Sequence, residues 1–567
     1  MKIIGIHHSG PISAAALVID GRVIAGAPQE RFSRIKHDDA FPHDAIAFCL
    51  EHAGLSLTDL DAVAIGWNAG ENAAMRYRRG FSDWMRYPGE WLASVPNHLL
   101  SRLGQPVLGS QGSFELGSGK RFTIHYVDHH TAHARLAQVA AGFDDCLIYA
   151  IDGWSEQKVT TLFRSNHGRL EVLYSKAFPH SIGAYYAAMT EFLGYRPFSD
   201  EWRVMGMAAY GDASRVPSLD PLIHLLPDGD YEFDLSYFDY YNFDRASAFT
   251  SKLEKLLGPP RRHGELLAQR HFDLAAAAQM QFERVMSHLL RAAHDATGST
   301  DLCLAGGTAM NCAFNGRIVE STPFRRCRIS FAPDDSGNAI GAALAVAAGH
   351  GSVQAQQLSS AIGPEFSDDA IGDALERYKL KARRVEDVVA ATVPLLAAGN
   401  VVGWFQGRSE FGQRALGHRS ILASPLRGDM KDRINASVKF REAYRPYAPV
   451  LPLAAVPSYF DTLDQEPVRF MEKAFRFRPG QSDVLPAVVH NDGTGRLQTV
   501  TPADEPLLHR LLEKFGEASG HPVLVNTSFN LNDEPIVCAP DDAIRSFATS
   551  GMDAMVIGRY VLTKGDL

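Results

Sequence analysis

The chain has 567 residues, of which 46% are hydrophobic and 21% charged, and a formal net charge of −9 at pH 7. This length exceeds what one hydrophobic core usually serves, so two or more domains are expected, and the composition is that of an ordinary globular protein. The acidic balance offers no basic surface for nucleic acid and favours a small-molecule substrate.

Cysteine usage and the N-terminus indicate the compartment. Six cysteines are too few for a disulfide framework in a chain of this length, and none form a Cys-x-x-Cys pair. The first residues, MKIIGIHHSG, lack the long apolar segment of a signal peptide, and no run reaches the ~18 apolar residues needed to span a bilayer. We therefore expect a cytoplasmic protein with reduced thiols and no membrane contact.

The N-terminal part predicts two successive α/β cycles. Apolar runs and turn residues place its strands at 2–6, 14–19, 22–25, 62–65, near 124, 146–151, 158–163, 170–174 and 302–305, and its helices at 44–53, 129–141 and 338–348. Asp20-Gly21 and Asp152-Gly153 each end a strand that another strand follows. This correspondence hints at a duplicated α/β half, as in actin-like ATPases.

A change of composition marks the domain boundary. Gly, Ser, Gln and Pro replace the apolar periodicity at 349–369, so we expect one domain over residues 1–355 and another over 370–567. The C-terminal domain predicts helices at 385–398, where Pro394 can cause a kink, and 540–549, and strands at 400–405, 522–526 and 554–557.

A histidine pair indicates a candidate metal site. His129 and His133 are four residues apart and share a helix face, whereas His130 points elsewhere. Imidazole suits iron or zinc, and carboxylates usually complete such a site, for which Asp152 and Asp335 are candidates. The alternatives are two ordinary histidines and, for Asp335, a cap on the following helix.

Two polar strand ends are candidate ligand sites. The paired glycines Gly306 and Gly307 end a strand, and their bared amides can cradle phosphate oxygens at a helix start. Ser528 and Asn530 alternate at the end of another strand, which would place both on one face, free to bond a nucleotide or carbamate. A tight strand-to-helix turn and a plain strand end are the alternative interpretations.

The densest positive charge lies in the C-terminal part. Residues 407–420 hold three arginines in a glycine-punctuated segment, and Lys439, Arg441 and Arg445 follow. Guanidinium and ammonium groups hold phosphate and carboxylate-like groups, and Leu416 and the glycines make a solvent-facing helix a poor alternative. In an acidic chain, this cluster predicts an anionic ligand.

Together these segments resemble the O-carbamoyltransferases of the nodulation-factor and antibiotic pathways, nearly end to end. The resemblance rests on Glu30 to His37, His129 to His133, Met205 to Ala208, Leu304 to Gly307, Met310 to Cys312, Gly337 to Ala343, Arg408 to Ser420, Lys439 to Pro449, Asn526 to Asn530 and Glu534 to Val537.

The resemblance implies an α/β enzyme of two domains. The N-terminal domain would have the actin-like ATPase (ASKHA) fold with duplicated halves, and the C-terminal domain would be an α/β domain similar to the YrdC family. The C-terminal domain would form carbamoyl adenylate and pyrophosphate from carbamoyl phosphate and ATP. The N-terminal domain would then transfer the carbamoyl group to a small-molecule hydroxyl, such as that of a secondary metabolite or sugar.

The resemblance also implies the roles of individual residues. A divalent metal, with Fe(II) expected, would be bound by His129, His133, Asp152 and Asp335. The co-substrates ATP and carbamoyl phosphate would contact Lys36, Gly306, Gly307, Asn311, Arg414, Lys439, Arg441, Arg445, Arg496, Ser528 and Asn530. Catalytic roles would fall to Arg414, Lys439, Arg445 and His8.

One departure from the family concerns activation of the acceptor. Family members carry a His-Asp pair shortly before a Ser-Ala-Ala run, where this chain has Gly10-Pro11. His7 or His8 could substitute through a rearranged turn, and we assign His8. The acceptor itself is not identified, although loops within 67–104 are expected to contact it, and a homodimer is compatible with the sequence.

Three other functions are alternatives to O-carbamoyl transfer. A tRNA-modifying carbamoyl-adenylate enzyme would need a basic surface, and a sugar-kinase-like phosphotransferase would convert ATP to ADP. An inactive nucleotide-binding protein would bind nucleotide without turnover, and only Gly10-Pro11 suggests it.

Overall fold

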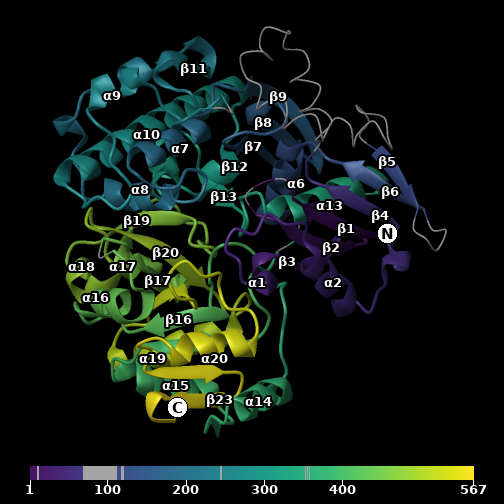
Figure 1. Ribbon diagram of the computed structural model, residues 1–567, viewed down its shortest axis with the longest axis vertical. Coiled ribbons are helices and arrows are strands. Elements are labelled where there is room, and N and C mark those ends of the chain that lie inside the picture. The colour runs from purple at the N-terminus through teal and green to yellow at the C-terminus, as the bar shows by residue number, and fades with distance from the viewer. Residues whose placement is uncertain are drawn as a thin grey trace. The chain divides into compact units, whose positions relative to one another are not determined.

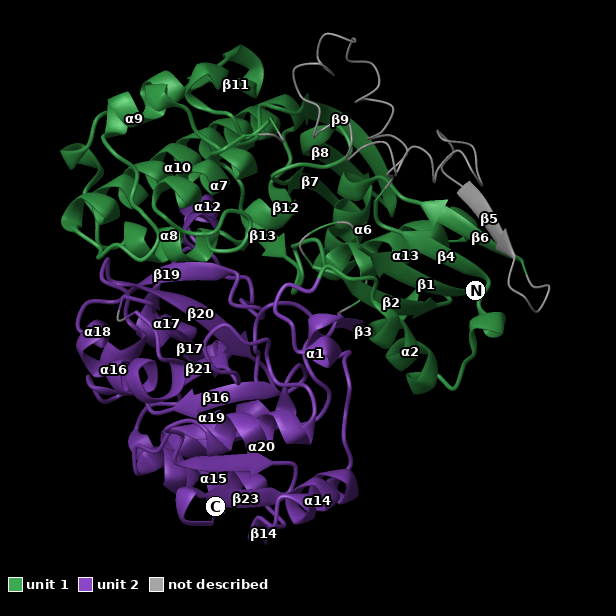
Figure 2. Cartoon of the chain, viewed as in Figure 1, with its two compact units in different colours: residues 1–24, 39–311, 321–357 green, residues 25–38, 312–320, 358–567 purple. Residues whose placement is uncertain are grey.

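The computed structural model describes residues 1–8, 10, 12–67, 111–115, 121–242, 245–351, 353, 356, 358–442 and 444–566. The chain forms two compact units, coloured separately in Figure 2. Unit 1 comprises residues 1–24, 39–311 and 321–357, and unit 2 comprises residues 25–38, 312–320 and 358–567. Two short segments from the N-terminal part of the sequence therefore belong to unit 2. The predicted acceptor loops of 67–104 lie, apart from Trp67, outside the described residues.

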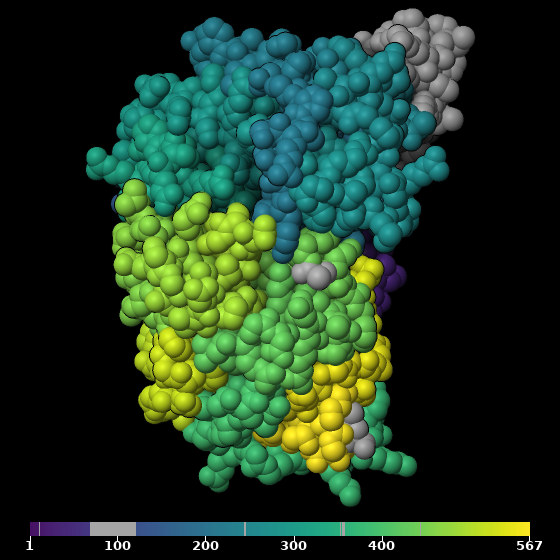
Figure 3. Space-filling view, turned by 90° about the vertical axis from the view of Figure 1, so that its left-hand side faces the viewer, coloured from purple at the N-terminus to yellow at the C-terminus, as the bar shows by residue number. Residues whose placement is uncertain are grey.

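The first sheet of unit 1 has the strand order β3-β2-β1-β4-β6-β5 (Figure 1). β1 pairs antiparallel with β2 and parallel with β4, and β4 pairs parallel with β6. The strands are β1 (Lys2–His7), β2 (Ala14–Ile19), β3 (Arg22–Pro28), β4 (Ala62–Ile65), β5 (Gln111–Glu115) and β6 (Arg121–Tyr126). β1 and β2 are almost wholly buried, which explains their continuous apolar sequences. On the one face of the molecule drawn in Figure 3, only a small purple area of the N-terminal segment is visible.

The second sheet repeats this topology. Its order is β13-β12-β7-β8-β9, in which β7 pairs antiparallel with β8 and parallel with β12, and β12 pairs parallel with β13. The strands are β7 (Asp145–Ile151), β8 (Lys158–Asn166), β9 (Arg169–Ala177), β12 (Asp301–Ala305) and β13 (Arg326–Ile329). β3-β2-β1-β4-β6 corresponds to β9-β8-β7-β12-β13 in order, and β2-β1-β4-β6 corresponds to β8-β7-β12-β13 also in direction, so unit 1 contains two topologically equivalent halves.

Helices α6 (His129–Ala141) and α13 (Gly337–His350) pack closely against each other, α13 also against the first sheet and α6 against the second. Glycines permit this approach. A Cβ atom on Gly341 would lie 2.0 Å from the carbonyl oxygen of Ala132, and one on Gly5 of β1 would lie 1.8 Å from that of Ala339. The small residues of α13 thus allow backbone to pack on backbone where the site is built.

Further helices and a small hairpin complete unit 1. Its other helices are α2 (His43–His52), α7 (Ile182–Phe192), α8 (Glu201–Ala208), α9 (Ser251–Leu257) and α10 (Gln269–Thr297), and a small hairpin joins β10 (Ile223–Leu225) to β11 (Tyr231–Phe233). No helix in the part of the chain that the structure describes combines the length and the apolar character needed to cross a membrane.

Unit 2 is built on a ten-stranded sheet with the order β14-β23-β22-β15-β16-β21-β17-β20-β19-β18. The strands are β14 (Arg383–Arg384), β15 (Val402–Phe405), β16 (Arg419–Ala423), β17 (Ala448–Pro452), β18 (Phe460–Asp461), β19 (Lys473–Phe477), β20 (Thr494–Val500), β21 (Leu524–Ser528), β22 (Ala554–Ile557) and β23 (Tyr560–Thr563). Two hydrophobic clusters contain residues from different helices: one draws on α15 and α19, the other on α14, α16 and α20.

The helices of unit 2 include two from the segments that precede residue 358. The helices are α1 (Glu30–Ser33), α11 (Cys312–Asn315), α14 (Asp368–Arg377), α15 (Val388–Ala397), α16 (Met430–Ile434), α17 (Val456–Tyr459), α18 (Gln481–Val484), α19 (Pro506–Ser519) and α20 (Pro540–Ala548), and α12 (Ile318–Ser321) follows α11. Arg31 of α1 is buried and donates to the carbonyl oxygen of Gly412, and Arg34 donates to those of Pro535 and Ile536 at 2.8 and 2.6 Å. These bonds tie the segment 25–38 to the rest of unit 2.

One predicted strand differs from the structure. β21 ends at Ser528, so the expectation that Ser528 and Asn530 alternate on one strand face is wrong. The two side chains still meet, because the Ser528 hydroxyl donates to Asn530 Oδ1 at 2.7 Å across the turn. Pro394 lies inside α15, and the helix continues past it.

Candidate metal centre and anion-binding group

Helix α6 positions the histidine pair. Its first turn is capped by Asp128, whose carboxylate accepts from the backbone nitrogen of Thr131 at 2.9 Å. His129 and His133 lie one turn apart on the buried face, and their Nε2 atoms are 3.2 Å apart. Helical periodicity thus brings two imidazoles to one point, as their spacing predicts.

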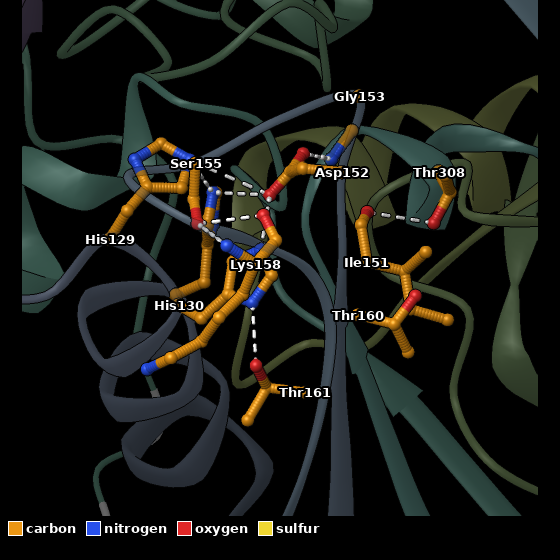
Figure 4. A network of polar contacts seen from close by, with 12 residues as sticks. His129, His130, Ile151, Asp152, Gly153, Ser155, Lys158, Thr160, Thr161 and Thr308 are labelled. Carbon is orange, nitrogen blue, oxygen red and sulfur yellow. Dashed lines mark hydrogen bonds and ion pairs between the residues drawn. The ribbon is translucent and has the colours of Figure 1, made fainter. Parts of the chain in front are cut away.

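Two carboxylates complete the cluster. Asp152 follows β7, and its Oδ2 lies 3.1 Å from His133 Nε2; Asp335 precedes α13, and its Oδ1 lies 3.4 Å from His129 Nε2. One ligand atom from each of the four residues lies within 4.8 Å of all the others. Figure 4 shows Asp152 beside the α6 histidines.

The donor set fits a divalent metal. Asp152 Oδ2 is buried and has no hydrogen-bond donor among the described residues, so a cation is the partner it lacks. Burial alone would lower the pKa of His129, yet the Asp335 and Asp152 carboxylates raise it well above its usual value. Burial raises the pKa of Asp152, but His133 and His129 outweigh this effect and hold the pKa well below its usual range. Two imidazoles and two carboxylates are ligands that iron and zinc both accept.

The glycines after β12 make room for Asp152. Gly306 has φ +85°, and a Cβ atom there would lie 2.3 Å from the carbonyl oxygen of Ile151. The backbone nitrogen of Gly307 donates to Asp152 Oδ1. In this structure the paired glycines therefore position a carboxylate, and the Gly307 amide that was expected to cradle phosphate is already bonded.

Asp334, next to Asp335, accepts the hydrogen bond in the turn before α13. Asp334 Oδ1 accepts from the backbone nitrogen of Ser336 at 3.0 Å before α13 begins. The Asp335 carboxylate faces the histidine pair instead, which is the geometry of a ligand and not of a helix cap. His130, the third histidine of the block, bonds Thr161 Oγ1 through Nδ1 at 2.7 Å (Figure 4).

Two histidines at the end of β1 differ in their surroundings. His7 is fully buried, neither ring nitrogen has a hydrogen-bond partner in the described structure, and Nε2 lies 3.8 Å from Asp335 Oδ2. Burial lowers the pKa of His7 to about 3, against the pull of Asp335. The centroid of the His8 ring instead lies 5.4 Å from that of the Phe41 ring. Gly10 is described, whereas Pro11 of the Gly10-Pro11 pair lies outside the described residues.

The side-chain amide of Asn311 is hydrogen-bonded to another residue of unit 1. Its amide nitrogen donates to Gln279 Oε1 at 2.9 Å, and its amide oxygen accepts from Gln279 Nε2 at 3.0 Å. This reciprocal amide pair uses the groups that were expected to bind nucleotide.

A separate group of cations lies in unit 2. Lys439 ends a five-residue π-helical turn, Asn435–Lys439, a conformation frequent at functional sites. Its buried ammonium donates to Ser528 O at 2.5 Å, to Asn530 O at 2.9 Å and to Asn530 Oδ1 at 2.6 Å. The predicted partners of Lys439 are thus assembled around it, although all the contacted atoms are neutral.

Further positive charges act on Lys439. Burial, followed by the positive charges of Arg441, Arg445 and Lys36, holds the pKa of Lys439 well below its usual value. Arg441 Nε donates to Asn435 Oδ1 at 2.9 Å, Arg445 lies 3.7 Å from a Glu442 carboxylate oxygen, and Lys36 lies 3.9 Å from Asp533. Lys36 comes from the segment 25–38, so sequence separation does not reveal this proximity.

Arg414 and Arg496 extend this group. Burial and the charges of Arg414 and Arg441 lower the pKa of Arg496 to about 9, and its Nε has no hydrogen-bond partner in the described structure. Burial raises the pKa of the Cys312 thiol, and the nearby positive charges of Arg496 and Arg414 oppose this rise. Mutual repulsion among buried cations is costly unless an anion joins them.

Only one of the three arginines in residues 407–420 belongs to this group. Arg408 donates to the carbonyl oxygen of Gly363 at 3.1 Å, and Arg419 donates to that of Gln406 at 2.9 Å and stacks on Phe405. Both hold loops of unit 2 in place. The sequence does not reveal these structural roles, and no spacing pattern shows that Cys312 lies beside the arginines.

Comparison with known proteins identifies the family. Residues 2–344 match the model of the carbamoyltransferase N-terminus, and residues 393–564 match that of the carbamoyltransferase C-terminus. The chain belongs to the carbamoyltransferase family. It is therefore an enzyme, a transferase.

Relatives of this carbamoyltransferase come from several bacteria. It is 35% identical to the uncharacterized protein sll1178 of Synechocystis sp., over 99% of this chain and 96% of that protein. It is 36% identical to the nodulation protein NolNO of Sinorhizobium fredii, over 97% and 78%. It is 30% identical to the 3'-hydroxymethylcephem-O-carbamoyltransferase of Streptomyces clavuligerus, over 64% of each chain.

Proposed function

We propose that this carbamoyltransferase forms carbamoyl adenylate from ATP and carbamoyl phosphate in unit 2 and transfers the carbamoyl group to a small-molecule hydroxyl in unit 1. The group of buried and partly buried cations in unit 2 carries the proposal. Lys439, Arg414 and Arg496 gather positive charge in an acidic chain, and such density calls for a polyanionic ligand.

The first step has two parts. Carbamoyl phosphate and water give carbamate and inorganic phosphate, and a carbamate oxygen then attacks the α-phosphorus of ATP, so that pyrophosphate leaves and carbamoyl adenylate forms. Negative charge grows on the phosphate oxygens in this reaction. Fixed cations in a site that excludes water stabilise that charge strongly, and Lys439, Arg445 and Arg414 are the residues to which we assign this role.

The second step transfers the carbamoyl group. The acceptor oxygen attacks the carbamoyl carbon, AMP leaves, and the acceptor proton goes to a base. We propose that His129, His133, Asp152 and Asp335 hold a divalent ion, with Fe(II) our expectation. When bound there, such an ion supplies Lewis-acid polarisation of a carbonyl oxygen.

The relatives support a hydroxyl acceptor. One is named as an O-carbamoyltransferase of a hydroxymethyl group, and others are nodulation proteins. We extend this to transfer onto oxygen of a secondary metabolite or sugar in the cytoplasm. The two topologically equivalent sheets of unit 1 support an actin-like fold for the transfer domain, and the YrdC-like fold of the C-terminal domain stays a prediction.

Product analysis tests the proposal. Protein supplied with ATP, carbamoyl phosphate, Mg²⁺ and Fe(II) should release pyrophosphate. Arg414→Ala should abolish that release, whereas the exposed and paired Arg427 offers a matched control, Arg427→Ala, that should not. His129→Ala should spare pyrophosphate release and stop transfer of the carbamoyl group.

Other products would identify the alternatives. Release of ADP would indicate a phosphotransferase, and nucleotide binding without turnover would indicate an inactive binding protein. Salt-sensitive binding of tRNA would indicate a tRNA-modifying enzyme. Screening hydroxyl compounds by mass spectrometry for the gain of one carbamoyl group would identify the acceptor.

A further inference from the structure

An exposed aromatic residue lies between two cations of unit 2. Phe440 stands between Lys439 and Arg441 in the sequence, and it is 56% exposed. A phenyl ring this exposed adds little to the packing of the core. The cation group of unit 2 therefore has beside it a flat apolar surface that solvent or a ligand can reach.

The backbone of Phe440 is strained. Its φ of 46° and ψ of 52° lie in the left-handed region, which is uncommon for residues with a Cβ atom and an outlier for a bulky one. Such conformations cluster at active sites and ligand clamps, where the surrounding structure holds them in place. Glycine would adopt this conformation without strain, so neither the backbone nor the core explains a phenylalanine at this position.

Hydrogen bonds to Asn435 hold the strained turn. The buried Asn435 uses its carbonyl oxygen to accept from the backbone nitrogens of Phe440 and of Arg441, the latter at 3.2 Å. Its side-chain oxygen accepts from Arg441 Nε at 2.9 Å, and Arg441 Cζ lies 4.7 Å from the centroid of the Tyr447 ring. These contacts fix both the backbone of Phe440 and the guanidinium group that follows it.

The turn places neighbouring side chains in different surroundings. Lys439 is buried, and its ammonium donates to the carbonyl oxygen of Asn530 at 2.9 Å, whereas Phe440 reaches solvent and Arg441 is half-buried. Consecutive Cα atoms are only about 3.8 Å apart. A ligand that these cations hold is therefore within reach of the phenyl ring.

The chemistry of this surface selects the ligand. Lysine and arginine bind phosphate groups, and an exposed aromatic ring stacks on another flat π system. Of the two co-substrates of the proposed reaction, ATP has both a polyphosphate and an aromatic base, whereas carbamoyl phosphate has no aromatic part. Cations and an aromatic ring on adjacent residues thus match a nucleotide.

We propose that Phe440 stacks on the adenine base of ATP while Lys439 and Arg441 bind its phosphates. The left-handed backbone at Phe440 presents the ring to solvent, and the hydrogen bonds to Asn435 keep it there. This inference rests on the proposed function and deepens it by assigning the residue that contacts the base.

Isothermal titration of the full-length protein tests the stacking. The probes are ATP, without carbamoyl phosphate, and tripolyphosphate, which has the phosphates but no base. In Phe440→Leu the dissociation constant for ATP should rise about tenfold, and that for tripolyphosphate should stay within about twofold of the parent. Tyr378→Leu is the matched control, because Tyr378 is another exposed aromatic residue of unit 2, and it should bind both probes as the parent does. An unchanged dissociation constant for ATP in Phe440→Leu overturns the proposal.

Two further variants separate stacking from folding. Phe440→Gly relieves the left-handed strain, so its midpoint of urea unfolding should be no lower than that of the parent although it binds ATP about tenfold more weakly. In Phe440→Trp, ATP should quench the emission of the added indole and tripolyphosphate should not. Equal emission changes with both probes overturn the proposal. If ATP quenches this emission but the parent releases no pyrophosphate with carbamoyl phosphate, the proposed function fails and the stacking stands.

Discussion

Glu472 in unit 2 gives a prediction on stability that can be worked through in numbers. Its side chain is buried, and its carboxyl oxygen Oε2 accepts from the backbone nitrogen of Phe470 at 2.7 Å. The neighbouring Lys473 is already paired with Asp464 at 2.5 Å. Burial raises the pKa of Glu472 from 4.5 to about 7, although Lys473 pulls it down.

The raised pKa fixes the sign of the effect. The folded protein holds this proton more tightly than the unfolded chain, so the free energy of unfolding falls as pH rises from 4.5 to about 7. The rise of the pKa from 4.5 to about 7 corresponds to about 3 kcal/mol of stability at low pH. Most of it, about 2 to 3 kcal/mol, is lost between pH 5 and 8.

Glu472→Gln removes the ionisation while keeping the size of the side chain and the acceptor for Phe470. The unfolding free energy of the variant minus that of the parent should therefore rise by about 2 to 3 kcal/mol from pH 5 to pH 8. Urea unfolding of the full-length protein at several pH values, followed by circular dichroism and fluorescence, measures this difference. A difference that does not change with pH would show that Glu472 titrates normally and would refute the reasoning.

Three further predictions concern both units. Lys439→Met should slow pyrophosphate release by about 100- to 1000-fold, as loss of a preorganised cation does elsewhere, and a rate near that of the parent would contradict its role. Asp152→Asn should reduce bound metal to well under one ion per chain by mass spectrometry while pyrophosphate release continues; full metal occupancy would argue against the cluster as ligands. Lys473→Met should destabilise the protein by ~3–5 kcal/mol in urea unfolding, and adding Asp464→Leu should recover much of the loss because the uncompensated buried charge disappears. Equal stability of the single and double variants would contradict that account.

Local elements were largely predictable from the sequence. The helix expected at 129–141 and the strands expected at 62–65 and 554–557 have those bounds in the structure. Each is marked by an apolar pattern and a boundary residue within a few positions, such as Asp128 before α6. β21 was placed two residues too early, because the turn before it carries apolar residues as well.

The candidate site was predictable only where spacing determines proximity. His129 and His133 meet because one helix turn separates them, but no local pattern shows that the Gly307 amide is bonded to Asp152 or that Asn311 is paired with Gln279. Likewise, the local motif did not distinguish Arg414 from Arg408, whose partner comes from a loop earlier in the chain. The roles assigned to Arg445 and His8 stay predictions.

The binding of Arg31 and Arg34 to carbonyl groups of unit 2 has a consequence for how this protein can be made and dissected. During synthesis, the segment 25–38 leaves the ribosome long before Gly412, Pro535 and Ile536 exist. The guanidinium groups of Arg31, which is buried, and Arg34, which is partly buried, therefore have no partners until the chain is nearly finished. For the same reason, a fragment of residues 358–567 lacks these donors and the nearby Lys36. Supplying residues 25–38 as a separate peptide is therefore the natural first step toward a soluble, active C-terminal half.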